Sequence, residues 1–196
     1  MKRGVTMNSL KQIKEWLDIF EPFNEQERED CLYIKQFLEE ERNLLLRDNV
    51  KMHFTASAWV LNPEKDKVLM LYHNIYQSWS WSGGHADGEG NLLAVAMKEV
   101  QEESGLSSLR PIAETPLSIE ILGVQPHYKK NKFISAHLHL NYTFLLQSTK
   151  KETLTVCPEE NSKVCWFPPE KAVQVSTESW MKPVYEKLNA KMQKYL

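Results

Sequence analysis

The sequence predicts an α/β fold in which helices cover the faces of a mixed β-sheet. Short apolar segments with the composition of strands fill the middle of the chain, an amphipathic helix interrupts them, and a last helix begins near Pro183. Strands, one helix, more strands and a terminal helix together indicate a sheet with helices packed on it. The expected strands span residues 54–61, 68–73, 119–124, 137–146 and 164–167.

The first fifty residues differ from the rest of the chain. Ser9 with Gln12, and Asn24 with Glu27, are each typical of the capping box that begins a helix. Both predicted helices have an apolar face that needs burial, which favours packing on the main domain. A dimer contact and a cover over a substrate site remain open alternatives. The predicted units are an N-terminal two-helix extension, residues 1–50, and a main domain, residues 51–196.

Composition indicates a small intracellular protein. The 196 residues include 24 basic and 26 acidic side chains, so nothing favours a nucleic acid partner. Cys31, Cys157 and Cys165 are odd in number and lack Cys-x-x-Cys spacing, so we expect buried thiols instead of disulfides or a zinc knuckle. No segment approaches about 18 uninterrupted apolar residues, and no signal peptide is evident. We therefore expect a cytoplasmic protein without a membrane partner.

Three glutamates gather in the predicted helix that follows a glycine-rich loop. Glu99, Glu102 and Glu103 stand at i, i+3 and i+4 and so share one face in the last turns. Each like-charge pair at this spacing costs a few tenths of a kcal/mol, and the helix dipole also disfavours acids at this end. A solvated acidic helix is the ordinary alternative. A divalent cation such as Mg²⁺ or Mn²⁺ reverses both penalties, so the pattern predicts a metal site.

The rest of this helix agrees with a packed element. Asn91 is the expected N-cap and Gly105 the expected C-terminal residue beyond the last turn. An apolar stripe runs beside the acidic face at the spacing of helical turns. Its members are Leu93, Ala96, Met97 and Val100.

This segment resembles the Nudix box, G-x5-E-x7-R-E-U-x-E-E-x-G-U, in which U is a bulky apolar residue. The positions that fall in register are Gly84, Glu99, Val100, Glu102, Glu103, Gly105 and Leu106. Gly90 and Lys98 depart from the pattern, because the box has Glu and Arg there and the two typically form an ion pair. Our hypothesis is that Glu89 and Lys98 form a shifted substitute pair, and the alternative is that both are solvated.

The resemblance covers about residue 53 to the end and implies the family's α/β/α sandwich, with the two leading helices outside it. It also implies metal-dependent hydrolysis of a phosphoanhydride bond in a nucleoside diphosphate linked to another moiety, with ADP-ribose slightly favoured. Nucleoside triphosphates as substrates, a nucleotide-sensing module without hydrolysis, and isomerase chemistry on an allylic diphosphate are the alternatives. The expected partner is a small nucleotide, and a homodimer is open.

The resemblance also suggests roles for individual residues. Glu99, Glu102 and Glu103 would bind Mg²⁺ or Mn²⁺ together with the carbonyl of Gly83. The general base in relatives is either the middle Glu of the helix, here Glu102, or a Glu in a loop before a late strand. Glu159 and Glu160 are the candidates for that second case, with a solvated loop pair as the alternative. Among these residues we expect Glu102, Glu103 and Glu160 to be catalytic.

Candidate substrate contacts surround the glycine loop. Gly84 allows close approach of the backbone, and His85 follows it directly. His137 and His139 alternate on a predicted strand, so both share one face and are able to contact phosphates or protonate a leaving oxygen. An ordinary polar sheet face is the alternative, and the spacing matches no zinc pattern. Trp81 would stack on a base or lie in the core.

Overall fold

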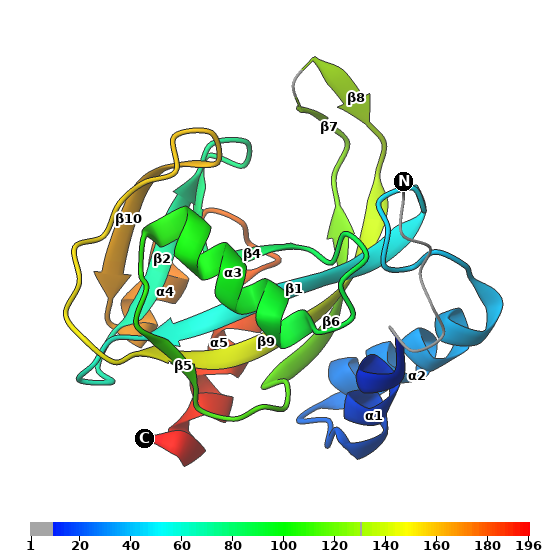
Figure 1. Ribbon diagram of the computed structural model, residues 1–196, viewed down its shortest axis with the longest axis horizontal. Helices are drawn as coiled ribbons and strands as arrows, with labels where there is room; N and C mark the ends of the chain where they lie inside the picture. Colours follow the sequence, from blue (N-terminus) through cyan, green and yellow to red (C-terminus); the bar gives the residue numbers. More distant parts are fainter. Residues whose placement is uncertain (1–9, 130) are drawn as a thin grey trace.

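The computed structural model describes residues 10–129 and 131–196. Its centre is an eight-stranded mixed sheet (Figure 1), in which β1 and β9 are parallel neighbours and the other pairs are antiparallel. The main path through the sheet is β10-β2-β1-β9-β5, with β3 on β2, β4 on β1 and β6 on β9. The strands are β1 (Met52–Leu61), β2 (Val68–His73), β3 (Ser78–Ser80), β4 (Ser82–His85), β5 (Leu109–Pro111), β6 (Ser118–Val124), β9 (His137–Ser148) and β10 (Asn161–Phe167).

All five predicted strands are present. The bounds of β2 agree with the prediction, and the other four strands are longer than predicted because backbone pairing continues past the apolar pattern. The expected strands do not include the short strands β3, β4 and β5, or a hairpin, β7 (His127–Lys129) with β8 (Lys132–Ile134), that projects from the sheet (Figure 1). Strands of three or four residues are too short to show an alternating pattern.

Helices cover both faces of the sheet, as the sequence predicts. Figure 1 shows α3 (Leu92–Ser104) in front of the sheet, with α4 (Pro169–Val175) and α5 (Lys182–Met192) behind it. Alternate residues of β1 supply the two cores: Phe54 belongs to the core beneath α3, and Trp59 stacks on Tyr185 of α5 at 5.4 Å. The last helix ends at Met192, and a 3-10 turn, η2 (Gln193–Tyr195), follows it.

The two N-terminal helices, α1 (Lys11–Ile19) and α2 (Glu25–Glu40), pack against the same sheet. Ile13 and Ile34 are fully buried in the core that α3 also covers. Asn24 caps α2, and its side chain accepts a hydrogen bond from the Glu27 N–H at 3.0 Å. The predicted capping residue Ser9 lies outside the described residues. Asp30 of α2 accepts a hydrogen bond from the backbone of β6, so this helix protects an edge strand.

A buried charge cluster joins α2 to α5 and β6. Glu27 is fully buried, and the Nζ atoms of Lys191 and Lys187 lie 2.8 Å and 3.3 Å from its carboxylate oxygens. Lys187 also lies 3.0 Å from Glu120 of β6. These lysines are buried because each one meets a carboxylate that the N-terminal helix or the sheet supplies.

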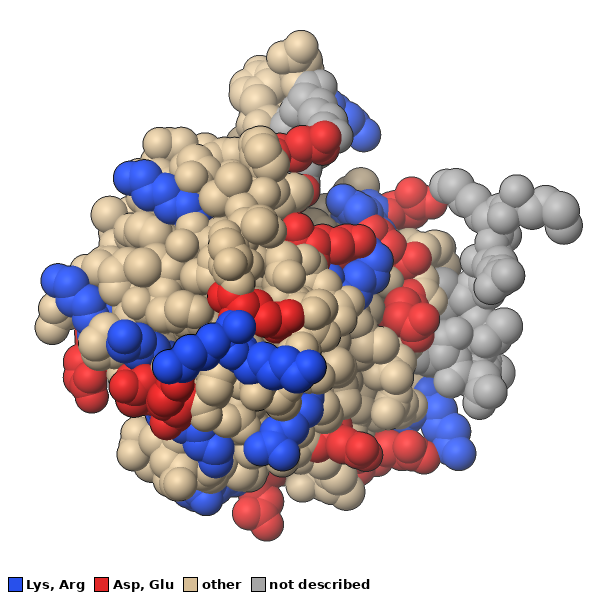
Figure 2. All heavy atoms as spheres, turned by 60° about the vertical axis from the view of Figure 1, so that its left-hand side comes forward, with Lys and Arg blue, Asp and Glu red and all other residues tan. Residues whose placement is uncertain are grey.

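The surface and the cysteines agree with the composition. Both signs of charge are interspersed over the face that Figure 2 shows. All three cysteines are free thiols, but only Cys31 is buried, while Cys157 and Cys165 are half-buried. Within residues 10–129 and 131–196, none of the helices combines the length and the apolar character that a bilayer crossing requires.

Candidate active site

The helix that carries the three glutamates begins and ends where the sequence predicts. The Asn91 side chain accepts a hydrogen bond from the Ala94 N–H at 3.1 Å, and Gly105 ends the helix at φ 76°, in the left-handed region that glycine favours. Ala96 and Val100 are fully buried, so the apolar stripe faces the sheet. This packing fixes the orientation of the acidic face above β4.

Glu103 is the most deeply buried of the three glutamates. It is 5% exposed, and its carboxylate accepts hydrogen bonds from Ser82 Oγ at 2.6 Å and from the Gly83 N–H at 3.3 Å. Burial raises the pKa of Glu103 to about 8, and the charges of Glu99 and Glu160 act in the same direction. None of the described residues forms an ion pair with this carboxylate. Its oxygen atoms are the ligands that a hard divalent cation prefers, and its burial favours a cation as partner.

Glu99 occupies the space that a side chain at Gly84 would need. A Cβ atom added to Gly84 would collide with the Glu99 carboxylate and displace it from the loop. Burial also raises the pKa of Glu99, and the nearby Glu102 and Glu160 add to this shift, while Lys98 opposes it. The glycine loop thus places two carboxylates and its own backbone within one small region.

Glu102 differs from the other two glutamates because it faces solvent. Its side chain is 55% exposed and accepts a hydrogen bond from Lys98 Nζ at 2.9 Å. The predicted pair between Glu89 and Lys98 is therefore wrong. Lys98 pairs within its own helix at the favourable i, i+4 spacing, whereas the Glu89 carboxylate accepts a hydrogen bond from the Asn91 N–H at 2.8 Å.

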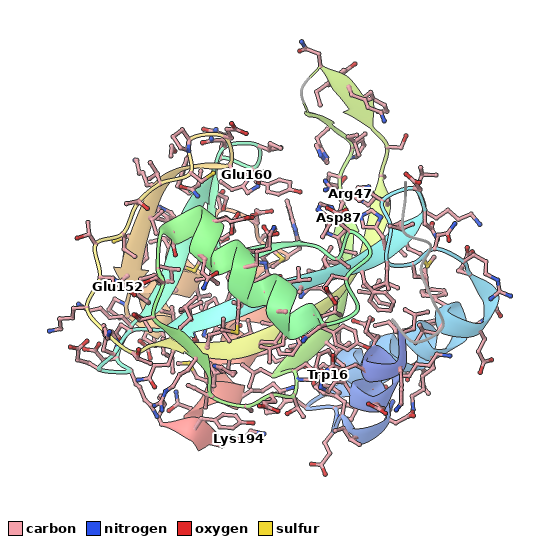
Figure 3. All side chains as sticks on the ribbon, viewed as in Figure 1. Trp16, Arg47, Asp87, Glu152, Glu160 and Lys194 are labelled. Carbon is pink, nitrogen blue, oxygen red and sulfur yellow. The ribbon has the colours of Figure 1, made fainter. Side chains whose placement is uncertain are left out.

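A different ion pair braces the loop. Arg47, in the segment that follows α2, forms a bidentate pair with Asp87, with 2.7 Å between Nε and Oδ1. This pair raises the pKa of Arg47, and the negative charges of Glu99 and Glu160 contribute as well. Figure 3 shows Arg47 and Asp87 side by side at one end of the site, with Glu160 at the other. The sequence analysis missed this pair, because no local pattern connects residues forty positions apart.

The structure brings one of the two loop glutamates toward the acidic helix. Glu160 is half-buried just before β10, and its charge contributes to the raised pKa values of Glu99 and Glu103. The next residue, Asn161, donates a hydrogen bond to the backbone carbonyl of Glu103 at 2.9 Å, which ties the start of β10 to the end of α3. Glu159 is exposed.

The predicted histidines meet beside the loop, together with one that the sequence analysis missed. Strand pairing places His53 of β1 opposite His139 of β9, and His53 is only 4% exposed. The ring centroid of His53 lies 4.9 Å from that of His137 and 5.1 Å from that of His85. A single sequence gives no signal for this meeting, because it depends on the parallel register of β1 and β9.

Burial favours the neutral form of two of these imidazoles, those of His53 and His139. It lowers the pKa of His53, and it lowers the pKa of His139 to about 2, with the neighbouring histidines contributing. A neutral His139 lacks the proton that a general acid would deliver, so the hypothesis that this residue protonates a leaving oxygen is not supported.

Trp81 lies between β3 and β4, half-buried toward the core beneath α5. Its ring meets Tyr185 edge to face at 5.5 Å. Trp79 similarly packs on Phe167 at 4.9 Å. Both tryptophans thus belong in part to the core, and Trp81 keeps some exposed surface.

Fold and site together define an α/β protein in which a glycine loop lies against a buried and a half-buried carboxylate of the next helix. The model of the NUDIX domain matches residues 51–188, and the chain belongs to this family, as its box resemblance implies. The family membership supports the prediction of a pyrophosphohydrolase, and members of this family generally use a divalent metal ion.

Solved structures with the same fold include Nudix hydrolases. An Ap4A hydrolase from C. elegans in a binary complex has a TM-score of 0.55 at 17% identity, covering 72% of this chain and 98% of that one. The Nudix hydrolase RenU from M. smegmatis has a TM-score of 0.52 at 12% identity, covering 72% and 86%. At these identities the comparison establishes the α/β/α fold alone. No curated protein matches the chain in sequence.

Proposed function

We propose that the protein is a Mg²⁺- or Mn²⁺-dependent pyrophosphohydrolase that acts on a nucleoside diphosphate linked to another moiety, with an ADP-ribose-like compound favoured. The observation that carries this proposal is the pair of half-buried Glu99 and buried Glu103 on the glycine loop. Ionising both carboxylates is costly because burial raises their pKa values. A hard divalent ion offsets this cost and is also what a pyrophosphate substrate requires.

The proposed ligands are Glu99, Glu102 and Glu103, together with the carbonyl of Gly83. When bound, the ion neutralises the pyrophosphate and lowers the pKa of the attacking water. Glu102 would have to exchange its contact with Lys98 for the ion, because the two side chains are hydrogen-bonded. Ser82 and the Gly83 N–H hold the Glu103 carboxylate in place throughout.

Two residues are candidates for the general base. Glu160 lies close enough to the two buried glutamates to raise their pKa values, and Glu102 lies on the helix itself. The substitutions Glu160→Gln and Glu102→Gln separate the two roles. Loss of the base lowers kcat about 100- to 10,000-fold at saturating Mg²⁺, whereas loss of a ligand raises the Mg²⁺ concentration needed for half-maximal rate.

Proposed substrate contacts lie on both sides of the loop. Gly84 has no side chain, so its backbone lies against the Glu99 carboxylate, and we propose that an ion held there brings a substrate phosphate next to this backbone. His85, His137 and His139 line the adjoining sheet face, where we propose that the substrate phosphates lie. Trp81 offers the remaining exposed part of its ring to a base.

The substrate class is tested by incubating the full chain and Mg²⁺ with a panel of diphosphate compounds. The panel contains ADP-ribose, NDP-sugars, nucleoside triphosphates, isopentenyl diphosphate and, since Ap4A hydrolase shares the fold, dinucleoside polyphosphates. We expect AMP and a ribose phosphate from ADP-ribose. Saturable binding of nucleotides without any product would instead support the nucleotide-sensing module, and isomerised allylic product would support the isomerase.

Two substitutions give a matched test of the carboxylate centre. Glu103→Gln removes the most buried charge, and we expect kcat to fall about 1,000-fold, since several kcal/mol of charge stabilisation is lost. Glu89→Gln changes a carboxylate of the same segment that is exposed and hydrogen-bonded to the start of α3. This control should retain activity. Equal activities of the two variants would contradict the proposed role of Glu103.

A further inference from the structure

Three imidazole rings meet on one face of the sheet. His53 comes from the start of β1, and His137 and His139 come from the start of β9. The ring centroids lie 4.9 to 5.0 Å apart, and one nitrogen of each ring lies within 4.8 Å of the other two. In the described ranges, no carboxylate or thiol joins the three in this group.

Hydrogen bonds to the backbone orient two of these rings. His53 Nδ1 lies 3.1 Å from the carbonyl oxygen of Asn49, and His137 Nδ1 lies 2.8 Å from that of Ser135. A carbonyl oxygen only accepts, so in each ring Nδ1 carries the proton and Nε2 keeps its lone pair. Metal-binding histidines are oriented in this way, with the second ring nitrogen donating to a carbonyl.

The buried Nε2 atom of His53 is an acceptor that needs a partner. The residue is 4% exposed, and its Nε2 has no hydrogen-bond partner in the part of the chain that the structure describes. A buried acceptor without a partner is costly, and such groups in folded proteins usually have an ion, a water or a polar atom as their partner. A metal ion bound by this nitrogen would remove the cost.

The spacing also suits a tetrahedral metal ion. His137 Nε2 and His139 Nε2 lie 3.2 Å apart. Two imidazole nitrogens bound to one tetrahedral Zn²⁺ ion lie about 3.3 Å apart, as follows from a Zn–N distance of about 2.0 to 2.1 Å. Three imidazoles without a carboxylate favour a transition metal over Mg²⁺.

We propose that His53, His137 and His139 form a second metal site, which binds a transition metal ion and favours Zn²⁺. Three protein ligands leave a fourth position for the oxygen of a water or a phosphate. The ring of His85 lies 5.0 Å from that of His139, and His85 follows Gly84 directly, so this site adjoins the glycine loop. In this arrangement a substrate phosphate would contact the ion more readily than the rings.

The test measures Zn²⁺ and Co²⁺ binding to the full-length chain after chelator treatment, with excess Mg²⁺ present to occupy the carboxylates. We expect one equivalent of Zn²⁺ to bind, and Co²⁺ to give the intense visible bands of a tetrahedral site. His137→Ala should weaken Zn²⁺ binding by at least about 100-fold, because loss of a ligand exceeds the cost of losing an outer-shell partner. His127→Ala is the matched control, since His127 also bonds a backbone carbonyl but lies outside the group, and its affinity should not change.

Two further variants keep the result decisive. His139→Gln repeats the ligand test if circular dichroism shows that His137→Ala does not fold. Glu103→Gln should bind Zn²⁺ as tightly as the unaltered chain. This variant therefore tests the second metal site independently of the proposed hydrolase activity. Absence of Zn²⁺ binding, equal affinity in the histidine variants, or loss of binding in Glu103→Gln would each overturn the proposal. The 3.2 Å contact would then be an N–H···N hydrogen bond.

Discussion

Glu103→Gln should stabilise the metal-free protein at pH 8 while it lowers metal-dependent activity about 1,000-fold. Glutamine keeps the shape of the side chain, and its carbonyl oxygen can still accept the hydrogen bond from Ser82. The substitution removes a negative charge that is 95% buried, since the residue is only 5% exposed. A carboxylate that serves only to stabilise the fold would give the opposite result.

The size and sign of this effect follow from the pKa of Glu103. Burial raises it from 4.5 to about 8, so the folded state binds the proton more tightly than the unfolded state does. The stabilisation of the folded state by protonated Glu103 is complete below pH 4.5 and is lost as the pH rises through 8. Linkage gives a loss of roughly 3 kcal/mol between pH 5 and pH 8.

Urea unfolding of both proteins at pH 5 and pH 8, with a chelator present, measures this loss. Between the two pH values, the stability of the unaltered chain should fall by about 3 kcal/mol more than that of Glu103→Gln. Mg²⁺ at pH 8 should restore stability to the unaltered chain and not to the variant. Parallel pH profiles of the free energy of unfolding would refute the reasoning. They would mean that the fold does not raise the pKa of Glu103.

Three further predictions concern ion pairs. Lys191→Met should lower the free energy of unfolding by about 3 kcal/mol, because Glu27 keeps a buried charge and loses a cation, and adding Glu27→Gln should recover most of this loss in urea unfolding. Arg47→Ala should lower kcat about tenfold, since the loop loses its bidentate brace and misplaced groups react slowly. Lys98→Ala removes only an exposed pair worth less than about 0.5 kcal/mol and should leave kcat within about twofold.

Each of these predictions has an outcome that contradicts it. A double variant as unstable as Lys191→Met would show that the lysine acts through packing and not through the charge of Glu27. Equal rates in Arg47→Ala and Lys98→Ala would show that the contact of Arg47 with Asp87 does not position the loop.

Helix α3 and most of the sheet could be predicted because they depend on single residues and their neighbours in the sequence. Asn91 and Gly105 mark the helix ends through side-chain capping and a left-handed φ, which are properties of single residues and their neighbours. The alternation of His137 and His139 on β9 places both on one face for the same reason. The five long strands carry enough apolar residues to show their pattern.

The contacts that could not be predicted depend on how distant segments meet. The side chain of Lys98 reaches both Glu99 and Glu102. It forms the shorter contact with Glu102, which stands at the favourable i, i+4 spacing. The pairing of Arg47 with Asp87 and the approach of His53 to His139 depend on chain packing and on strand register, which no local pattern records.

The central claim is that Glu99 and Glu103 hold a divalent cation at the glycine loop. Crystals grown with Mn²⁺ and a non-hydrolysable ADP-ribose analogue test it directly through anomalous diffraction. The account predicts a manganese peak about 2.2 Å from carboxylate oxygens of Glu99 and Glu103, with the diphosphate of the analogue beside it. A nucleotide bound elsewhere, with no ion at these two glutamates, would contradict the account.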